Sequence, residues 1–538
     1  MSQQIQNPAS PLAPVRKKSS VVASTGIVSL LTLVSRIFGL ARDSILALTL
    51  GTNLGADAFA VAFRIPNIFR RMFAEGNLTL SFVPVFSESL KSSQQQAKKL
   101  VNTTFTFLSL VLILLTLFGV IAASWWVFMA APGFVQNPEK FALTRLLTQI
   151  TFPYIFLVSL GALAMGILNS KKHFAAPAAS PIFLNIGIIL GAVFFSRFFS
   201  EPSIGVAWGV LLGGVFQLMI QIPSVMKYGF FPKIDFDFKD PQAKKVFKLM
   251  LPAMYGSAAY QVNLLSIYFL ASFLREGAVS SLNYAGRVIE FPLGIFAISI
   301  ATVLLPRFSD HAAQKRTEKL TSSLMQALNA VWWLNVPAMV AMVVLSKPIT
   351  ALLFFRGQFD LDSLKLTEQA LTYYALGLPF VSGSRILTNA FYAMQDSKKP
   401  VIATNISVVV NILVGVALMF WIEHRGLALA VSIGAAVNFF YLLKYYREKA
   451  GALGLKKALR ELTKVMLAAM VMGAALIVVQ HYWDWSLARF WTRLAYVLSL
   501  IGIGLVIYLM LTFVLKAEFS QKISQFLLRR LKKSSAAN

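Results

Sequence analysis

Charged side chains inside apolar stretches are the residues of this sequence that could do chemistry. Most of them lie between Ser35 and Glu88, in two runs apolar enough to be membrane helices, and others lie near residue 287. A charge at bilayer depth is costly, so such a residue normally faces a protein or water-filled interior and marks a functional site. The candidate substrate-binding residues are Arg36, Arg42, Asp43, Asp57, Arg64, Asn67, Arg70, Arg71, Glu75, Arg287 and Glu290.

Arginine outnumbers the acidic residues in this set, which predicts a cationic interior suited to an anionic substrate. The planar guanidinium can grip two phosphate oxygens at once, as a lysine ammonium cannot. Residues three, four or seven apart share a helix face, so Arg64, Arg71 and Glu75 are predicted to form one stripe. Arg287 and Glu290 are three apart and can pair. For any single pair the alternative is an internal salt bridge that only holds helices together.

The composition places these charges inside a membrane. Of 538 residues, 57% are hydrophobic and only 13% are charged, and the mean hydropathy is +0.67. Apolar runs of roughly 20 residues, enough to cross a bilayer as a helix, recur almost from end to end. Because lipid leaves no partner for open sheet edges, we predict an all-α polytopic membrane protein with about 14 transmembrane helices.

The excess of basic residues follows the predicted topology. The formal net charge is +28, and most of the lysine and arginine between the apolar runs would lie on the side that carries both termini. By the positive-inside rule, both termini are predicted to be cytoplasmic. Contact with anionic membrane lipids accounts for the rest of the charge, so we expect no nucleic-acid partner.

The two halves of the chain resemble each other. VPVFSE at 83–88 resembles LPRFSD at 305–310, and NSKK at 169–172 matches DSKK at 396–399, in the same order and at nearly one offset. Six helices per repeat predict two lobes related by a pseudo-twofold axis along the membrane normal, as in transporters that rock around a central site. The predicted units are a cytoplasmic tail (1–25), an N-terminal lobe with helices one to six (26–226), a cytoplasmic amphipathic linker (227–245), a C-terminal lobe with helices seven to twelve (246–446), helices thirteen and fourteen (447–515) and a basic cytoplasmic tail (516–538).

The sequence carries no sign of an enzyme. It has no cysteine, no phosphate-binding loop, no nucleophile motif and no metal-ligand spacing, so we predict a transporter without a cofactor. Two kinds of transporter remain to be weighed. A cation-coupled multidrug exporter would be expected to have a more acidic cavity, whereas a flippase for a polyprenyl-diphosphate-linked sugar would need cationic walls.

Six stretches are similar to one known family: SRIFGLARD (35–43), DAFAVAFRIPNIFRRMFAEG (57–76), SFVPVFSE (81–88), FALT (141–144), QITFPYIFLVSL (149–160) and YAGRVIEFPLG (284–294). They resemble the MurJ (MviN) lipid II flippases of the bacterial cytoplasmic (inner) membrane, within the multidrug/oligosaccharidyl-lipid/polysaccharide (MOP) exporter superfamily. The resemblance implies a cavity between two lobes and a groove at helices thirteen and fourteen for the lipid tail. It implies alternating-access transport of lipid II to the periplasmic leaflet for peptidoglycan synthesis, cell-wall biogenesis and cell shape. The implied partners are lipid II, membrane lipids and cell-wall synthesis proteins, with a monomer as the working unit.

The resemblance also implies roles for the charged residues. The family's essential cavity residues correspond to Arg36, Arg42, Asp43, Asp57, Arg70, Arg71, Glu75, Arg287 and Glu290. The arginines would receive the diphosphate, and the acids would pair with them when the site is empty. Gly286 departs from the family pattern, which often has an acid there. Asp396 is a candidate site for a monovalent cation or a helix cap, and the membrane potential is the other candidate source of energy.

Overall fold

The computed structural model describes residues 18–237, 239–294, 298–451, 453–482, 490–522 and 524–525. Within these ranges the regular structure is helical and no strand is present. Eight helices in the described part are long and apolar enough to cross a membrane by length and composition. The fold class predicted from the sequence is therefore confirmed, whereas the count of fourteen spans stays a prediction.

The first bundle contains the elements from α1 to α10. Their bounds are α1 (Lys18–Leu50), α2 (Leu54–Phe73), the π-helical turn η1 (Ala74–Leu78), α3 (Thr79–Ser92), α4 (Gln94–Ile121), α5 (Ala123–Ala130), the 3-10 turn η2 (Pro132–Gln136), α6 (Pro138–Thr151), α7 (Tyr154–Ser170), α8 (Ala175–Val193), the 3-10 turn η3 (Phe195–Phe198), α9 (Pro202–Met219) and α10 (Ile222–Lys227). Helix α1 starts inside the predicted tail 1–25, because no glycine or proline interrupts the chain between Lys18 and Gly26.

The second bundle and the two last helices follow. Their bounds are α11 (Pro241–Ala271), α12 (Ala278–Pro292), α13 (Ile298–Ala313), α14 (Thr317–Val344), α15 (Ser346–Phe354), α16 (Leu361–Ala375), α17 (Leu378–Ala393), α18 (Lys398–Ala450), α19 (Leu455–His481) and α20 (Phe490–Val514). Helix α18 contains 53 residues, enough for two membrane-crossing helices. Ile422 and Glu423 break it with non-helical backbone angles, and Glu423 has a positive φ of 51°.

The internal repeat appears in the order of the elements. VPVFSE lies in α3 and LPRFSD lies in α13, and each of these helices has a proline inside it. A long helix and a short one, α4 and α5, follow α3, just as α14 and α15 follow α13. The two halves of the chain therefore build the same succession of helices, and each half forms one bundle.

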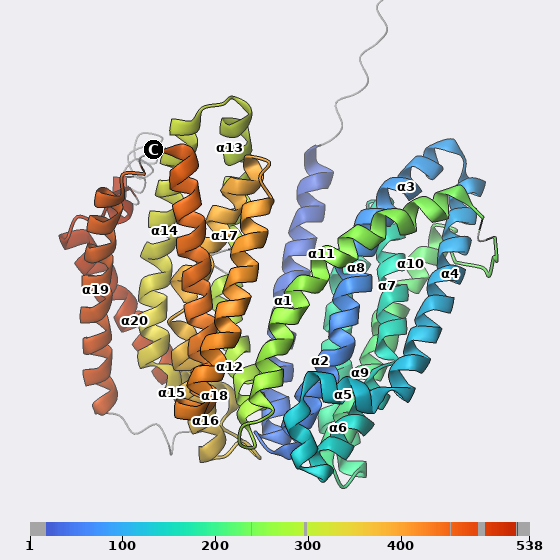
Figure 1. The fold of residues 1–538 in the computed structure, drawn as a ribbon, viewed down its shortest axis with the longest axis horizontal. Coiled ribbons are helices and arrows are strands. Elements are labelled where there is room, and N and C mark those ends of the chain that lie inside the picture. Colours follow the sequence, from blue (N-terminus) through green and yellow to red (C-terminus); the bar gives the residue numbers. More distant parts are fainter. Residues whose placement is uncertain are drawn as a thin grey trace, which may run out of the picture.

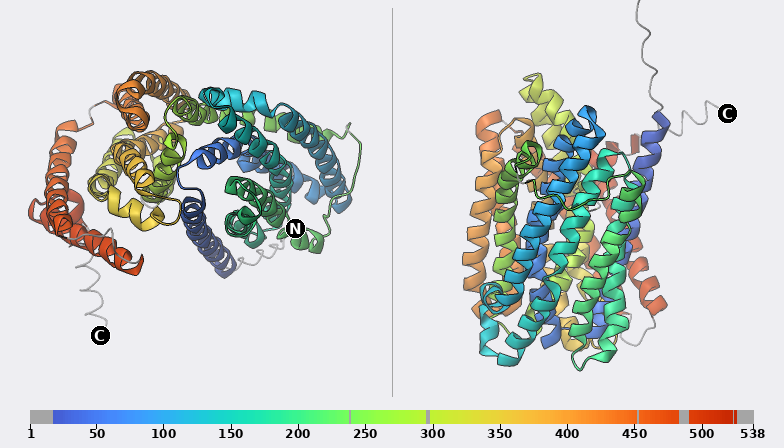
Figure 2. Two further views of the ribbon diagram at one scale, coloured as in Figure 1. Left: turned by 90° about the horizontal axis from the view of Figure 1, so that it is seen from below. Right: turned by 90° about the vertical axis from the view of Figure 1, so that its right-hand side faces the viewer.

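The two bundles lie side by side and diverge toward one end of the molecule (Figures 1 and 2). We call this end the terminus side, because α1 begins there and α20 ends there; the opposite end, where α1 ends and α2 begins, is the closed side. Helix α11 crosses between the bundles and packs on both α2 and α3 of the first and α18 of the second. Apart from α11, the main packing between the bundles joins α2 to α12 and α1 to α15.

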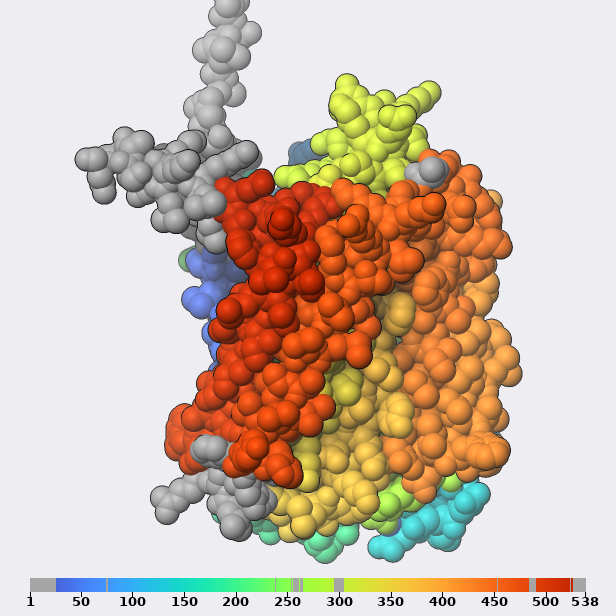
Figure 3. Space-filling model, turned by 90° about the vertical axis from the view of Figure 1, so that its left-hand side faces the viewer, coloured from blue at the N-terminus to red at the C-terminus, as the bar shows by residue number. Residues whose placement is uncertain are grey.

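Helices α19 and α20 pack against each other and, through α19, against α14 of the second bundle. Figure 3 shows them side by side on the face turned away from the first bundle. Within the first bundle the closest helix packing is that of α8 on α9. A Cβ atom added at Gly187 would lie 2.3 Å from the Cα atom of Gly213, so only glycine allows this approach.

Candidate substrate cavity and the closed side

Arg42 and Asp43 form a well-ordered charged pair on α1. Arg42 donates to Asp43 Oδ1 from Nε at 3.0 Å and from Nη2 at 2.7 Å. A third hydrogen bond runs from Arg42 Nη1 to Asn185 Oδ1 on α8, at 3.0 Å. Both charged side chains are nearly buried, with exposed fractions of 13% and 12%. The guanidinium is therefore held in one orientation by its own helix and by α8.

The second bundle contributes Arg287 and Glu290 from α12. Arg287 Nη1 donates to Glu290 Oε2 at 3.3 Å, the pairing that their spacing predicts, and Arg287 Nε lies 4.0 Å from Asp43 Oδ2. A chain of alternating charges thus runs from Glu290 through Arg287 and Asp43 to Arg42. It joins the two bundles, so the cations of α1 and α12 can act on one anion.

A cavity of about 120 Å³ lies beside this chain of charges. Its walls include Arg64 of α2, Tyr268 of α11, Arg287 of α12 and Tyr374 of α16. The Arg64 guanidinium carbon lies 5.0 Å from the centre of the Tyr268 ring. Arg64 Nε is buried and, among the residues that the structure describes, has no hydrogen-bond acceptor. A buried donor without an acceptor is destabilising, and an anion that enters the cavity could satisfy it.

Gly286 also lines this cavity. A Cβ atom added there would have no neighbour within 4 Å. This position therefore has room for an acidic side chain, and glycine adds no negative charge to the cavity wall.

Two further arginines lie along α2. Arg70 Nε donates to Asn67 Oδ1 at 2.8 Å, while Asn67 Nδ2 donates to the Phe63 carbonyl at 2.8 Å. Asn67, predicted to bind substrate, thus positions Arg70. Arg70 and Arg71 follow Arg64 by two helical turns, about 10 Å toward the terminus side. They would line the entrance on that side.

Arg36 and Glu75 complete the predicted set. Arg36 is exposed on α1, and its Nη1 would lie 2.5 Å from a Cβ atom at Gly294, so it packs on the backbone of the second bundle. Glu75 belongs to η1, but its side chain lies outside the described residues.

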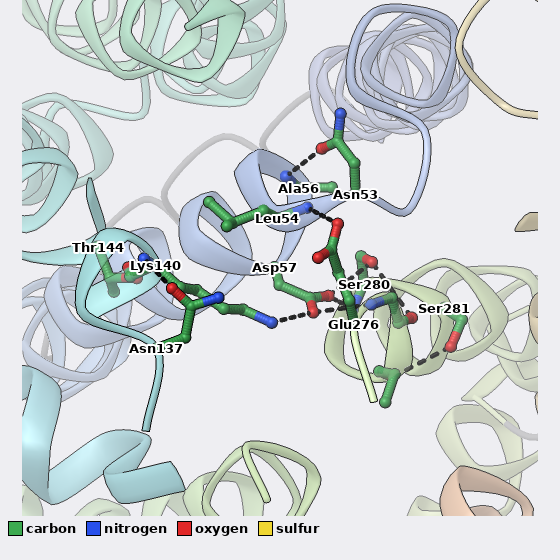
Figure 4. Close-up of polar contacts among 12 residues, drawn as sticks. Asn53, Leu54, Ala56, Asp57, Asn137, Lys140, Thr144, Glu276, Ser280 and Ser281 are labelled. Carbon is green, nitrogen blue, oxygen red and sulfur yellow. Dashed lines mark hydrogen bonds and ion pairs between the residues drawn. The ribbon is translucent and has the colours of Figure 1, made fainter. Parts of the chain in front are cut away.

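Asp57 lies at the closed side and is wholly buried, with an exposed fraction of 0%. Its Oδ2 accepts from Lys140 Nζ at 2.7 Å and from the Gly277 backbone N–H at 2.9 Å. Its Oδ1 accepts from the backbone N–H and hydroxyl of Ser280, at 2.8 Å and 2.7 Å (Figure 4). The carboxylate of the first bundle thus caps the start of α12 in the second. Asp57, which was predicted to bind substrate, thus has both carboxylate oxygens engaged by the protein in this structure.

Glu276 makes the reciprocal contact. Its carboxylate accepts a hydrogen bond from the Leu54 backbone N–H at 2.6 Å, at the start of α2 (Figure 4). Each bundle therefore supplies a carboxylate to the N-terminus of a helix in the other, where the helix dipole favours negative charge. We call Asp57, Lys140, Glu276 and Ser280 the latch.

Other contacts close the same side. The Thr52 hydroxyl donates to the Ser363 hydroxyl at 2.8 Å, and the Gln358 N–H donates to the Leu48 carbonyl at 2.9 Å. Across the closed side the two bundles are thus joined by hydrogen bonds from several loops, while the cavity lies further toward the terminus side.

The sequence interpretation did not include Lys140 among the candidate functional residues. A signal was available, because a lysine in the first turn of a helix opposes the helix dipole. Asn137 caps that turn through the Lys140 backbone N–H at 3.1 Å, and the lysine side chain is only 8% exposed. Such an unfavourable position indicates an acidic partner, which here is Asp57.

Asp396 does not have the surroundings of a cation site. Its Oδ2 pairs with Lys449 Nζ at 3.2 Å, and its Oδ1 accepts from the Lys399 N–H at 3.4 Å. Although burial opposes it, the hydrogen bond from Lys449 lowers the pKa of Asp396 below its ordinary value. These contacts are those of a helix cap. In the described part of the chain, no three His, Asp or Glu side chains gather as metal ligands would.

Comparison with known sequences identifies the family. The family described as "Lipid II flippase MurJ" matches residues 46–496. A "Probable lipid II flippase MurJ" of Buchnera aphidicola subsp. Acyrthosiphon pisum is 36% identical over 466 residues, which cover 86% of this chain and 91% of that protein. The "Lipid II flippase MurJ" of Burkholderia cenocepacia is 35% identical, over 85% of this chain and 90% of the relative. This chain belongs to the MurJ family.

Solved structures agree with the assignment to the MurJ family. A structure described as "Lipid II flippase MurJ, inward closed conformation" matches with a TM-score of 0.77 and 27% identity, over 91% of this chain and 99% of that one. An inward-facing MATE family transporter of the MOP superfamily matches with a TM-score of 0.64 at 14% identity, over 79% of this chain and 98% of that one. The second match concerns the fold alone. The MurJ fold of this chain is thus shared with transporters of the MOP superfamily.

Proposed function

We propose that this protein is a flippase that carries lipid II, the undecaprenyl-diphosphate-linked peptidoglycan precursor, from the cytoplasmic to the periplasmic leaflet of the bacterial inner membrane. The terminus side would face the cytoplasm and the closed side the periplasm. Membership of the MurJ family supports the substrate. The observation that carries the proposal is the charge chain between the bundles, beside an arginine whose buried donor has no acceptor.

The diphosphate would bind by exchanging partners with the acids of the cavity. In the empty site Asp43 neutralises Arg42 and lies near Arg287. Phosphate oxygens would take over the Arg287 donors now facing Asp43 and Glu290, and would accept from Arg64 Nε. A ligand shifts a conformational equilibrium only through contacts that differ between the two states. Since Arg287 belongs to one bundle and Arg42 to the other, an anion held by both draws the bundles together on the cytoplasmic side.

Opening of the periplasmic side requires the latch to separate. Asp57 would lose the N–H groups of Gly277 and Ser280, and Glu276 would lose that of Leu54. Both helix N-termini and both carboxylates would then be hydrated. Lys140 lies on the same bundle as Asp57, so this ion pair can persist in both states and limit the cost of exposure.

The remaining parts of the proposal concern the lipid tail, the energy and the assembly. The groove at α19 and α20 would take the polyprenyl tail, and a monomer would be the working unit. The membrane potential is the energy source that we propose, with a monovalent cation as the alternative to be tested. Cell-wall synthesis proteins would receive the flipped lipid on the periplasmic side.

Complementation tests the proposal. A bacterium depleted of its own lipid II flippase is supplied with the wild-type chain, Arg42→Ala, Arg287→Ala or a control, Arg197→Ala. Arg197 is exposed in η3, away from the cavity. At matched membrane abundance, wild type and control should restore growth and both cavity variants should fail. If every variant rescues, the arginines have a structural role only. If the inserted wild-type chain does not rescue, another lipid-linked sugar becomes the substrate to test.

A further inference from the structure

The connection between α10 and α11 wraps around the outside of α4 (Figure 1). We call its described residues, 228–237 and 239–240, the strap. The Lys233 N–H donates to Asn102 Oδ1 at 2.9 Å, and the Asp235 N–H donates to Thr106 Oγ1 at 2.8 Å. Asn102 and Thr106 are one turn apart on α4, so the backbone of the strap is fastened along that helix. Such fastening determines which side chains of the strap face outward.

The strap presents large apolar side chains away from the protein. Ile234 is 71% exposed, Phe236 is 67% exposed and Phe231 is 54% exposed. The neighbouring Phe230 is buried instead, with its ring centre 5.2 Å from that of Phe86. Phe230 thus holds the strap on the first bundle, while the two other phenylalanines and Ile234 are exposed apolar side chains of the kind that mark a binding surface.

The charges around this patch are mainly basic, because Asp237 and Asp240 are engaged within the protein and Asp235 is half-buried, its Oδ1 accepting from the Asp237 N–H. Asp237 Oδ2 pairs with Lys99 Nζ at 2.7 Å, and Asp240 Oδ1 caps α11 by accepting from the backbone N–H groups of residues 242 and 243. The exposed basic residues on and beside the strap are Lys227, Lys233, Lys239, Lys244 and Lys248. A patch that combines apolar and basic side chains matches an anionic lipid surface.

The position of the strap along α4 agrees with a bilayer interface. Helix α4 begins with the polar residues QQQAKK at 94–99 and becomes apolar from Phe105, where it reads FTFLSLVLILL. The anchors Asn102 and Thr106 lie at this change. A polar recess of about 530 Å³, lined by Ser93, Gln95, Lys98 and other residues of α4 and the strap, opens next to it. The exposed apolar side chains of the strap at this boundary would suit acyl chains, and the polar recess next to it would suit lipid headgroups.

We propose that the strap binds the anionic phospholipid surface of the leaflet on the terminus side, with Phe231, Ile234 and Phe236 inserted among the lipids and the lysines on the headgroups. The strap leads directly into α11, which packs on both bundles. Lipid binding therefore holds the start of α11 at a constant depth while the bundles move. This surface lies on the outside of the first bundle, apart from the substrate cavity.

A nitroxide probe tests the insertion, and the absence of cysteine from the chain makes single-site labelling straightforward. The full-length protein with Ile234→Cys is labelled and placed in vesicles of phosphatidylcholine with phosphatidylglycerol. The control is Gln314→Cys, at an exposed position in the turn between α13 and α14 on the terminus side. The probe at 234 should collide readily with oxygen and rarely with a water-soluble nickel complex, and the control should do the reverse. Equal exposure of both probes to the nickel complex would overturn the proposal and leave the patch to a protein partner.

A second experiment tests the basic part of the surface. Salt should weaken the contact of the strap with anionic vesicles and so raise the accessibility of the probe at 234 to the nickel complex. In the Ile234→Cys background, the double substitution Lys233→Gln with Lys239→Gln should raise this accessibility already at low salt and should make it less dependent on salt. The matched control is Lys315→Gln, an exposed lysine on the terminus side of the second bundle. If the double variant and the control behave alike, the lysines do not bind the lipid. Neither readout depends on transport, so the result is independent of the proposed function.

Discussion

Removing Asp57 should release the closed side of the molecule. The Asp57→Ala substitution takes away the only carboxylate that, in the described part of the chain, caps the start of α12 from the other bundle. It also leaves Lys140 without its partner, although that side chain is only 8% exposed. We therefore expect a rise in the population in which the two bundles are separated at the latch.

The burial of the pair determines the size of this effect. Breaking a buried ion pair by removing one partner costs about 3–5 kcal/mol, because the other charge remains uncompensated. Since about 1.4 kcal/mol changes an equilibrium tenfold, the closed state should lose a factor of more than about one hundred relative to the open state. Ser280→Ala removes a single hydroxyl donor to the same carboxylate. It should cost about 2 kcal/mol, as expected for one hydrogen bond to a charged group.

Distance measurements between two spin labels can follow the opening. Arg197→Cys in η3 and Lys365→Cys in α16 place exposed labels on the two bundles at the closed side. The wild-type background should give a single distance component, that of the closed state. Ser280→Ala should add a longer component, and Asp57→Ala should shift most of the population to it. The same ordering should appear in thermal unfolding of the detergent-solubilised protein.

A double variant distinguishes this mechanism from general damage. Asp57→Asn with Lys140→Met removes both charges and replaces the lysine by an apolar side chain of similar length, so its closed state should be less destabilised than the sum of the single changes. An unchanged distance distribution in Asp57→Ala would refute the reasoning. So would a double variant whose destabilisation equals the sum of the effects of Asp57→Asn alone and Lys140→Met alone.

Three other outcomes follow from the geometry. Gly277→Ala should reduce the free energy of unfolding by about 1–3 kcal/mol and so lower the unfolding temperature, because φ is +84° and a Cβ would lie 2.6 Å from the Thr52 carbonyl oxygen. An unchanged unfolding temperature would contradict this. Asn185→Leu should slow growth in the complementation assay less than the loss of Arg42, since Asp43 still orients that guanidinium; equal loss would make the amide essential itself. The hydrogen bond from Lys99 lowers the pKa of Asp237 below its ordinary value of 3.8. The stabilisation of the strap by this ion pair is therefore complete above pH 3.8, and it is lost only as the pH falls through the lowered pKa. The probe at 234 should therefore report constant accessibility from about pH 8 to about pH 5, and a transition in that interval would implicate another group.

The sequence alone determined the class of the protein and the residues that carry charge into the membrane. Long apolar runs leave helices as the only way to satisfy the backbone, and a charge within such a run is visible without any knowledge of its neighbours. The pairing of Arg287 with Glu290 was also predictable, because a spacing of three residues on one helix brings two side chains together. The repeat of VPVFSE as LPRFSD likewise anticipated two successions of helices in the same order.

Only the tertiary structure separated the charges that are engaged in contacts between the bundles at the closed side from those beside the cavity. Asp57 and Asp43 look alike in the sequence, yet Asp57 is wholly buried against the start of α12 while Asp43 lies beside an arginine of the other bundle. Their partners lie far away in the chain, and sequence spacing predicts contacts only within one helix. Lys140 shows the same limit, because its partner belongs to another helix of the bundle. Which charges cap helices and which line the cavity depends on how the two bundles meet, and that is set by packing between elements rather than by any local pattern.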